Sequence, residues 1–130
     1  MNSASQYFPV ASCSGLAGAE AAPYDRRWLV VDSGGRWLTQ RDNARLAEVS
    51  VAIRFGYLVM RAPGMVRMDI PLDVIEDDDS VRQQVLVGEQ SVDAVDEGEL
   101  AATWLSNFTG TPCRLVKVHP DAAPVAWPAS

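Results

Sequence analysis

The chain has 130 residues, 48% of them hydrophobic, and a formal net charge of −6. This length fits one domain with an ordinary core and excludes two separately stable cores, and no apolar run reaches the ~18 residues of a membrane-spanning helix. The first seven residues are polar and uncharged and lack the basic and apolar regions of a secretory signal. We therefore expect a cytoplasmic protein with no membrane contact.

The charge is distributed unevenly along the chain. Residues 1–67 hold eight arginines and five acidic residues, whereas residues 68–130 hold three basic and twelve acidic residues. Nucleic-acid binding depends on a basic face that releases counterions, and the acidic second half opposes it. We expect no nucleic-acid partner, while a small anion held by a few arginines remains compatible with the sequence.

Alternating apolar residues and turn residues divide most of the chain into short strands. The expected strands, in chain order, are 7–10, 28–31, 36–40, 49–55, 57–61, 66–70, 81–87, 90–95 and 113–118. Pro9 confines the first strand to a sheet edge or a strand start. The strands on either side of Asp32–Gly35 are expected to form a β-hairpin. The acidic run Glu76–Asp79 is expected to be a solvated loop.

One helix is expected late in the chain, at about residues 97–109. Asp96 stands in the N-cap position with Glu99 three residues on, as in a capping box. An apolar stripe at helical spacing follows, formed by Leu100, Trp104, Leu105 and Phe108. Gly110 and Pro112 end the helix.

These elements predict a mostly β (α+β) fold: a small, closed or nearly closed β-barrel of mainly antiparallel strands with one α-helix. We expect residues 1–5 to be a flexible N-terminus, residues 6–119 to form the barrel domain, and residues 120–130 to be a tail rich in Pro and Ala. Closure of the barrel removes the exposed strand edges that so many short strands would otherwise create.

Few residues of the chain carry obvious chemistry. Cys13 and Cys113 have no metal-ligand spacing, and His119 is the only histidine, so we expect no metal site and no catalytic triad. Two small, half-buried cysteine side chains are expected rather than a disulfide, because cytosolic disulfides are uncommon. The chain alone is therefore not expected to be an enzyme.

The densest polar cluster is Tyr24–Trp28, which pairs with Thr39–Arg41 if the hairpin turns about Ser33–Gly34. That register brings Arg26 and Arg27 at one strand end near Gln40 and Arg41 at the other. Asp25 can hold one guanidinium while the other binds an anion, or an Arg–Asp network can simply close one end of the barrel. The small-residue loop 12–18 can offer N–H groups and serine hydroxyls to the same anion.

Several motifs in register resemble one family, the MOSC N-terminal β-barrel domain. The opening motif of that family, aromatic-Pro-Val-Lys-Ser-Cys-x-Gly, corresponds to residues 8–15, and its Tyr-Asp-Arg-Arg-Trp hallmark corresponds to residues 24–28. The resemblance continues through residues 35–41, 45–47, 62–65, 93–98, 104–108 and 112–116. It covers about residues 6–118.

The resemblance implies a role beside the molybdenum cofactor. In the family the barrel precedes a MOSC domain, whose cysteine holds molybdenum in cofactor sulfurases and in enzymes that reduce N-hydroxylated bases. Carried over by motif, Ser12 and Arg26 would contact the phosphate end of the pterin, and Arg27 and Arg41 complete the expected cofactor-binding set. Ala11 stands where the family has lysine, the stretch between Gly18 and Tyr24 is shorter than usual, and we expect no MOSC domain within the 130 residues.

Three functions are compatible with this sequence. The first is a non-catalytic barrel module that offers an anion-binding or docking surface to a MOSC-domain or other molybdenum-enzyme partner, sharing contact with its cofactor. The second is a structural or protein-interaction domain that has lost cofactor contact, which Ala11 favours. The third is a small redox or sulfur-handling protein that uses Cys13 or Cys113.

Overall fold

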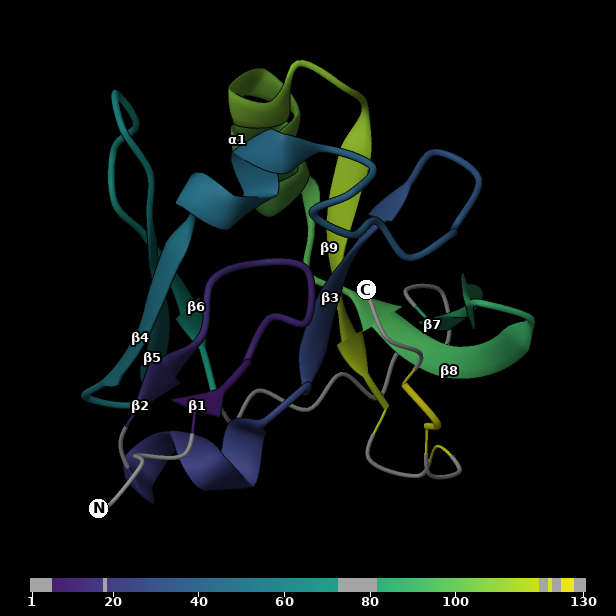
Figure 1. The fold of residues 1–130 in the computed structure, drawn as a ribbon, viewed down its shortest axis with the longest axis horizontal. Helices are drawn as coiled ribbons and strands as arrows, with labels where there is room; N and C mark the ends of the chain where they lie inside the picture. Colours follow the sequence, from purple (N-terminus) through teal and green to yellow (C-terminus); the bar gives the residue numbers. More distant parts are fainter. Residues whose placement is uncertain (1–5, 18, 73–81, 120–121, 123–124, 128–130) are drawn as a thin grey trace.

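The computed structural model describes residues 6–17, 19–72, 82–119, 122 and 125–127 (Figure 1). The predicted flexible N-terminus and the acidic run Glu76–Asp79 lie outside the described residues. The strands are β1 (Gln6–Tyr7), β2 (Leu16–Ala17), β3 (Trp28–Asp32), β4 (Ser50–Arg54), β5 (Tyr57–Arg61), β6 (Met68–Pro71), β7 (Arg82–Val87), β8 (Gln90–Asp96) and β9 (Cys113–Val118). The α-helix α1 spans Glu99–Thr109, and two 3-10 helices, η1 and η2, span Ala19–Tyr24 and Ala44–Glu48.

The strands form three antiparallel sheets. The largest has the order β3-β9-β8-β7, the second has the order β4-β5-β6, and β1 pairs with β2. The larger sheets curl around a shared interior, and α1 lies across one end of it, against β9 and η2 (Figure 1). The predicted mostly β, barrel-like fold with one late helix is therefore confirmed. The 3-10 helices and β2 were not predicted.

The main core lies between the two larger sheets and α1. It contains side chains from every layer, among them Trp28, Leu46, Leu58, Met60, Leu105 and Leu115. Burial of these apolar side chains is the main source of stability in a domain of this size. The alternation in β6, where Met68 and Ile70 are buried and their neighbours are exposed, is the pattern of a strand with one face in the core.

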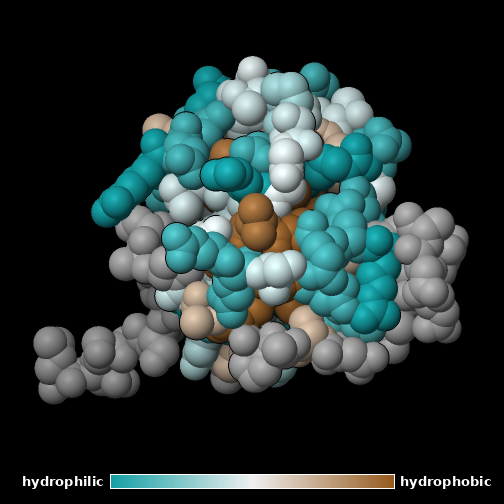
Figure 2. Space-filling view, turned by 90° about the vertical axis from the view of Figure 1, so that its right-hand side faces the viewer, coloured by the Kyte–Doolittle hydropathy of each residue, from teal (hydrophilic) through white to brown (hydrophobic). Residues whose placement is uncertain are grey.

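A second, smaller apolar cluster lies on the other face of the four-stranded sheet. It consists of Leu29, Val31, Val85, Val87, Val92, Ala94 and Val116. The described part of the expected tail packs on it: the Trp127 ring meets the Trp37 ring edge-on at 5.0 Å, and Val125 joins them. On the side of the molecule where β7 and β8 lie, apolar residues reach the surface at the centre of a hydrophilic rim (Figure 2).

The helix begins later than predicted and is capped differently. Gly98 is the N-cap residue with φ 108°, and no side chain caps the helix. Asp96 belongs to β8 instead, where its Oδ1 accepts a hydrogen bond from the Gly98 N–H at 2.7 Å, so the predicted Asp96 cap is wrong. Leu100 was wrongly placed in the apolar stripe, since it is 79% exposed while Ala101, Trp104, Leu105 and Phe108 are buried.

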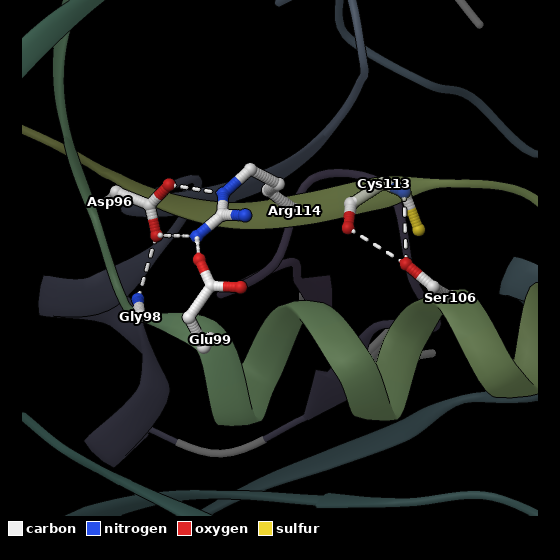
Figure 3. Close-up of polar contacts among 6 residues, drawn as sticks. All are labelled: Asp96, Gly98, Glu99, Ser106, Cys113 and Arg114. Atoms are coloured by element: carbon white, nitrogen blue, oxygen red, sulfur yellow. Dashed lines mark hydrogen bonds and ion pairs between the residues drawn. The ribbon is translucent and has the colours of Figure 1, made fainter.

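The Asp96 side chain does not cap the helix because it forms an ion pair with Arg114 (Figure 3). The Arg114 guanidinium on β9 bonds both oxygens of Asp96 and, at 2.6 Å, the Glu99 carboxylate in the first turn of α1. These hydrogen bonds, first from Asp96 and then from Glu99, raise the pKa of Arg114 above its usual value. At the other end of the helix, Ser106 Oγ both donates to the Cys113 carbonyl and accepts from the Cys113 N–H, at 3.1 Å each. The helix is thereby fixed to β9 at two points.

The predicted hairpin between residues 28–31 and 36–40 forms only in part. Val31 bridges Trp37, and the Leu38 N–H donates to the Val30 carbonyl at 2.8 Å. Beyond Leu38 the chain turns away, because Asp42 accepts hydrogen bonds from Thr39 N–H and Oγ1 and leads the chain into η2. The full strand expected at residues 36–40 is therefore wrong. β3 finds its continuous partner in β9.

Candidate functional site

The opening motif and the Tyr-Asp-Arg-Arg-Trp motif lie side by side in space. Residues 9–11 run parallel to the start of β3: the Trp28 N–H donates to the Pro9 carbonyl at 2.9 Å, and the Ala11 N–H donates to the Trp28 carbonyl at 2.8 Å. Val10 forms an isolated parallel bridge with Trp28. Two motifs that are separate in sequence therefore build one edge of the fold.

Asp25 organises this edge by using both of its carboxylate oxygens. Oδ1 accepts a hydrogen bond from the Phe8 N–H at 2.7 Å, and Oδ2 accepts one from Arg26 Nη1 at 2.8 Å. The Arg26 N–H donates to the Phe8 carbonyl at 2.7 Å. The predicted pairing of Asp25 with one of the two guanidiniums is confirmed, and the partner is Arg26.

Arg26 has an unusual backbone conformation. Its φ of 53° lies in the left-handed region, which non-glycine residues adopt at a cost. Its guanidinium carbon stands 5.5 Å from the centre of the Phe8 ring, within range of a cation–π interaction, and its side chain remains 40% exposed. Arg26 and Arg27 both precede β3, so strand alternation does not determine which way their side chains point.

Arg27 and Arg41 have different surroundings. Arg27 is half-buried, and its backbone is held by the Tyr24 carbonyl and the Val118 N–H, while no ion pair engages its side chain among the described residues. Arg41 is exposed in the turn that precedes η2. The pairing with β3 ends at Leu38, before Gln40 and Arg41, and no described hydrogen bond or ion pair joins Arg41 to Arg26. The structure therefore does not bring Gln40 and Arg41 to Arg26 and Arg27 as the expected register would.

Ser12 is a buried connector between the opening motif and β3. Its side chain is 1% exposed, and its Oγ accepts from the Val30 N–H at 3.0 Å and donates to the Val30 carbonyl at 3.3 Å. A serine hydroxyl has one proton to donate, and here it points at a main-chain carbonyl. In this conformation Ser12 holds the loop in place.

The rest of the small-residue loop is also engaged within the chain. The Cys13 N–H donates to the Val10 carbonyl at 3.0 Å and the Ser14 N–H to the Val49 carbonyl at 3.2 Å. Ser14 Oγ donates to the Ala47 carbonyl at 2.5 Å. Residues 12–14 therefore do not form an open ring of N–H groups that could surround an oxyanion. Of the residues expected to bind a phosphate here, only Arg26 and Arg27 keep guanidinium donors available at this edge.

Trp28 is the centre of a polar cluster that sequence reasoning missed. Its Nε1 donates to Glu97 Oε2 at 2.6 Å, its ring stacks on Tyr24 at 6.2 Å, and Lys117 Nζ lies 5.4 Å from the ring centre. Glu97 follows β8 and Lys117 lies on β9, so both arrive from the distant C-terminal half. A buried indole N–H needs an acceptor, and this requirement was the available signal for such a partner.

The two cysteines are free and buried. Burial, with a smaller contribution from the charge of Cys113, raises the pKa of the Cys13 thiol well above its usual range. The two thiols are unpaired as expected, but they are fully buried rather than half-buried. Such a thiol stays protonated at neutral pH, which disfavours a redox function.

Among the residues that the structure describes, none of the helices has the length and apolar character of a membrane span. Over the same residues, no three side chains of His, Cys, Asp or Glu converge in a way that could hold a metal ion.

Known proteins with similar sequences include molybdenum cofactor sulfurases and mitochondrial amidoxime-reducing components. Human molybdenum cofactor sulfurase is 31% identical over 118 residues, which is 85% of this chain but 13% of that protein. The mitochondrial amidoxime-reducing component 1 of Danio rerio is 31% identical over 102 residues, which is 77% of this chain and 30% of that protein. The chain thus spans less than a third of these relatives' own length.

A solved relative matches nearly the whole chain. The solution structure of a protein from Bordetella bronchiseptica superposes with a TM-score of 0.83 at 62% identity, covering 98% of both chains. The family model described as the MOSC N-terminal beta barrel domain matches residues 4–112. By this match, and by the motifs that meet along β3, the chain belongs to the MOSC N-terminal beta barrel domain family.

Proposed function

We propose that this chain is a non-catalytic accessory module that binds a molybdenum-cofactor protein and contacts an anion, such as the phosphate end of the pterin, through Arg26 and Arg27. The observation that carries the proposal is the geometry of Arg26. Its backbone is held in a strained conformation by Phe8, and Asp25 takes only one of the five N–H donors of its guanidinium. Strain maintained by several contacts is a feature of binding sites.

Electrostatics support the same edge. An arginine offers two parallel donors to a phosphate, and a second guanidinium nearby adds positive charge that favours the same anion. Arg27 supplies that second charge, and no described carboxylate neutralises it. The cofactor itself would supply the molybdenum chemistry, while the residues of this chain would orient the phosphate. A direct contact of Ser12 or Arg41 with the anion remains a prediction. The cytoplasmic location of the protein also remains a prediction.

The docking part of the proposal is tested with a MOSC domain expressed without its own N-terminal barrel. We expect this chain to bind that domain, measured by isothermal titration calorimetry, and we expect Arg26→Gln to weaken the binding when the domain carries its cofactor. Arg36→Gln is the matched control, because Arg36 is an exposed arginine whose carbonyl is hydrogen-bonded to Asp32, the last residue of β3, whereas Arg26 precedes the first. Absence of binding to the cofactor-loaded domain would contradict the proposal.

A second function is favoured by a specific observation. The hydroxyl of Ser12 and the N–H groups of Cys13 and Ser14 are all engaged within the chain, and Ala11 provides no cation. These features support a protein-interaction domain that has lost cofactor contact. Equal affinity for the cofactor-loaded and cofactor-free MOSC domain, unchanged in Arg26→Gln, would favour this second function over the first.

A further inference from the structure

The β4–β5 hairpin has an outer face that carries two arginines on either side of a small depression. Strand register puts Ser50, Ala52 and Arg54 of β4 on the same face as Tyr57, Val59 and Arg61 of β5, opposite to the face that enters the main core. The depression has a volume of about 130 Å³ and is lined chiefly by these side chains. It exists because Ala52 is short and lies directly across from Val59, between two long arginines.

The charge of this face is not balanced within the described chain. Arg54 and Arg61 are exposed and form no ion pair among the described residues. Asp69, which lies next to Val59 on the same face, forms its ion pair with Arg67 at 3.1 Å. The protein has a net charge of −6, so two arginines without ion-pair partners around one depression form a local patch of positive charge. An acidic partner complements this face.

The tip of the same hairpin presents an aromatic ring to solvent. Phe55 is 95% exposed and has a φ of 50°, followed by Gly56 with a φ of 81°. A two-residue turn with both φ values positive favours Asn-Gly, so phenylalanine is a poor choice for folding at this position. Tyr57, next to it, is also exposed. Arginine and aromatic side chains are the types that contribute most to protein interfaces.

We propose that the outer face of the β4–β5 hairpin is a docking surface for an extended acidic segment of a partner protein, whose carboxylates pair with Arg54 and Arg61 and whose apolar side chain packs on Phe55. Arg54 and Arg61 are four register positions apart along the hairpin, roughly 13 Å, so acidic residues four positions apart on an extended segment, which point the same way, can reach both arginines. This inference goes beyond the cofactor contact and does not require it, because the surface shares no residue with the Arg26–Arg27 edge.

The probe is a short synthetic peptide that alternates aspartate with serine and ends in leucine, with an asparagine-for-aspartate peptide as its neutral control. Binding is followed by NMR through the side-chain Nε resonances of the arginines. We expect saturable shifts at Arg54 and Arg61 with the acidic peptide alone, and about a tenfold loss of affinity in Arg54→Gln or Arg61→Gln. Arg36→Gln should bind like the wild type.

Phe55→Asn separates a binding role from a structural one. Because asparagine accepts the left-handed conformation better than phenylalanine, we expect this variant to unfold at a higher temperature and to bind the acidic peptide more weakly. The proposal is overturned if the neutral and acidic peptides behave alike, if Arg36→Gln loses as much affinity as Arg54→Gln, or if Phe55→Asn binds as well as the wild type. A failure of cofactor contact at Arg26 leaves these outcomes unchanged.

Discussion

The ring of Phe8 lies so close to Gly15 that a Cβ atom at residue 15 would stand 2.8 Å from the ring carbon Cε1. Contacts this short are essentially absent between real carbon atoms, so the aromatic residue that begins the opening motif requires the glycine that ends it. The N–H of the same Phe8 donates to Asp25 Oδ1, and its carbonyl accepts a hydrogen bond from the Arg26 N–H. Gly15 therefore helps to determine where Arg26 lies.

Gly15→Ala should destabilise the protein by about 1–3 kcal/mol, because the added methyl group overpacks against the Phe8 ring. Urea unfolding followed by tryptophan fluorescence measures the loss. The matched control is Gly34→Ala, where a Cβ would stand at 3.4 Å from its nearest neighbour, Asp32 Oδ1, and should cost much less. In the double variant Phe8→Leu with Gly15→Ala, the loss of stability should be smaller than the sum of the losses in the two single variants. A loss equal to that sum would show that the contact between residues 8 and 15 is unimportant.

Glu97→Ala should cost about 1–3 kcal/mol, because it leaves the buried Trp28 Nε1–H without its acceptor. Glu97→Gln keeps an acceptor oxygen at the same place and should recover most of that loss. The same urea titrations measure both variants, and Glu89→Ala, which removes one negative charge from an exposed position, is the control. If Glu97→Gln is as unstable as Glu97→Ala, the hydrogen bond to Trp28 is not what Glu97 contributes.

Neither cysteine should react with a thiol reagent in the folded protein at neutral pH. Cys13 and Cys113 are buried, and the raised pKa of Cys13 keeps its thiol protonated. Labelling with iodoacetamide, followed by mass spectrometry, should be negligible in buffer and complete for both residues in denaturant. Rapid labelling of either cysteine without denaturant would restore the redox hypothesis.

Stability at low pH should depend in part on Asp93. Its pKa is lowered from the ordinary value of 3.8, chiefly by the hydrogen bond from Arg82 and also by the Arg82 charge. A lowered pKa means that this contribution to stability is fully present above the unfolded pKa and is lost as pH falls through the folded pKa. Asp93→Asn should therefore flatten the dependence of unfolding free energy on pH between about pH 5 and pH 2.

Arg82→Gln serves as the companion variant for that measurement, because it removes the main cause of the lowered Asp93 pKa. It should flatten the same part of the stability curve as Asp93→Asn. Unfolding free energies at a series of pH values, taken from urea titrations, provide the comparison. A wild-type slope in both variants would mean that the Arg82–Asp93 pair does not govern acid stability.

Local sequence patterns predicted most of the fold. Alternation and turn residues identified β5 and β9 with the boundaries that the structure shows, because each is a strand with a regular ladder partner on at least one side. The pattern failed where a distant residue decided the outcome. Asp96 has the sequence position of a helix cap, but Arg114, eighteen residues later, engages its carboxylate.

The candidate site was predictable only in part, for the same reason. The sequence indicated that Asp25 would hold one of its two neighbouring guanidiniums, since adjacent opposite charges meet without tertiary structure, but only the structure identifies Arg26 as that partner. Ser12 could not be recognised as a connector, because its partner Val30 is a main-chain group that carries no side-chain signal. Arg41 was expected near Arg26 because the predicted hairpin continued to residue 40. In the structure the pairing with β3 ends at Leu38, where the Thr39–Asp42 turn begins.

The most direct test of the central claim is an NMR titration of this chain with a pterin phosphate, observed at the arginine side-chain Nε resonances. The account predicts a saturable shift at Arg26 and Arg27, its loss in Arg26→Gln, and no comparable shift at Arg36. Asp25→Asn should also weaken binding, since Asp25 holds the Arg26 guanidinium in place. No saturable shift at Arg26, or an equal shift at Arg36, would contradict the proposal that this edge binds an anion.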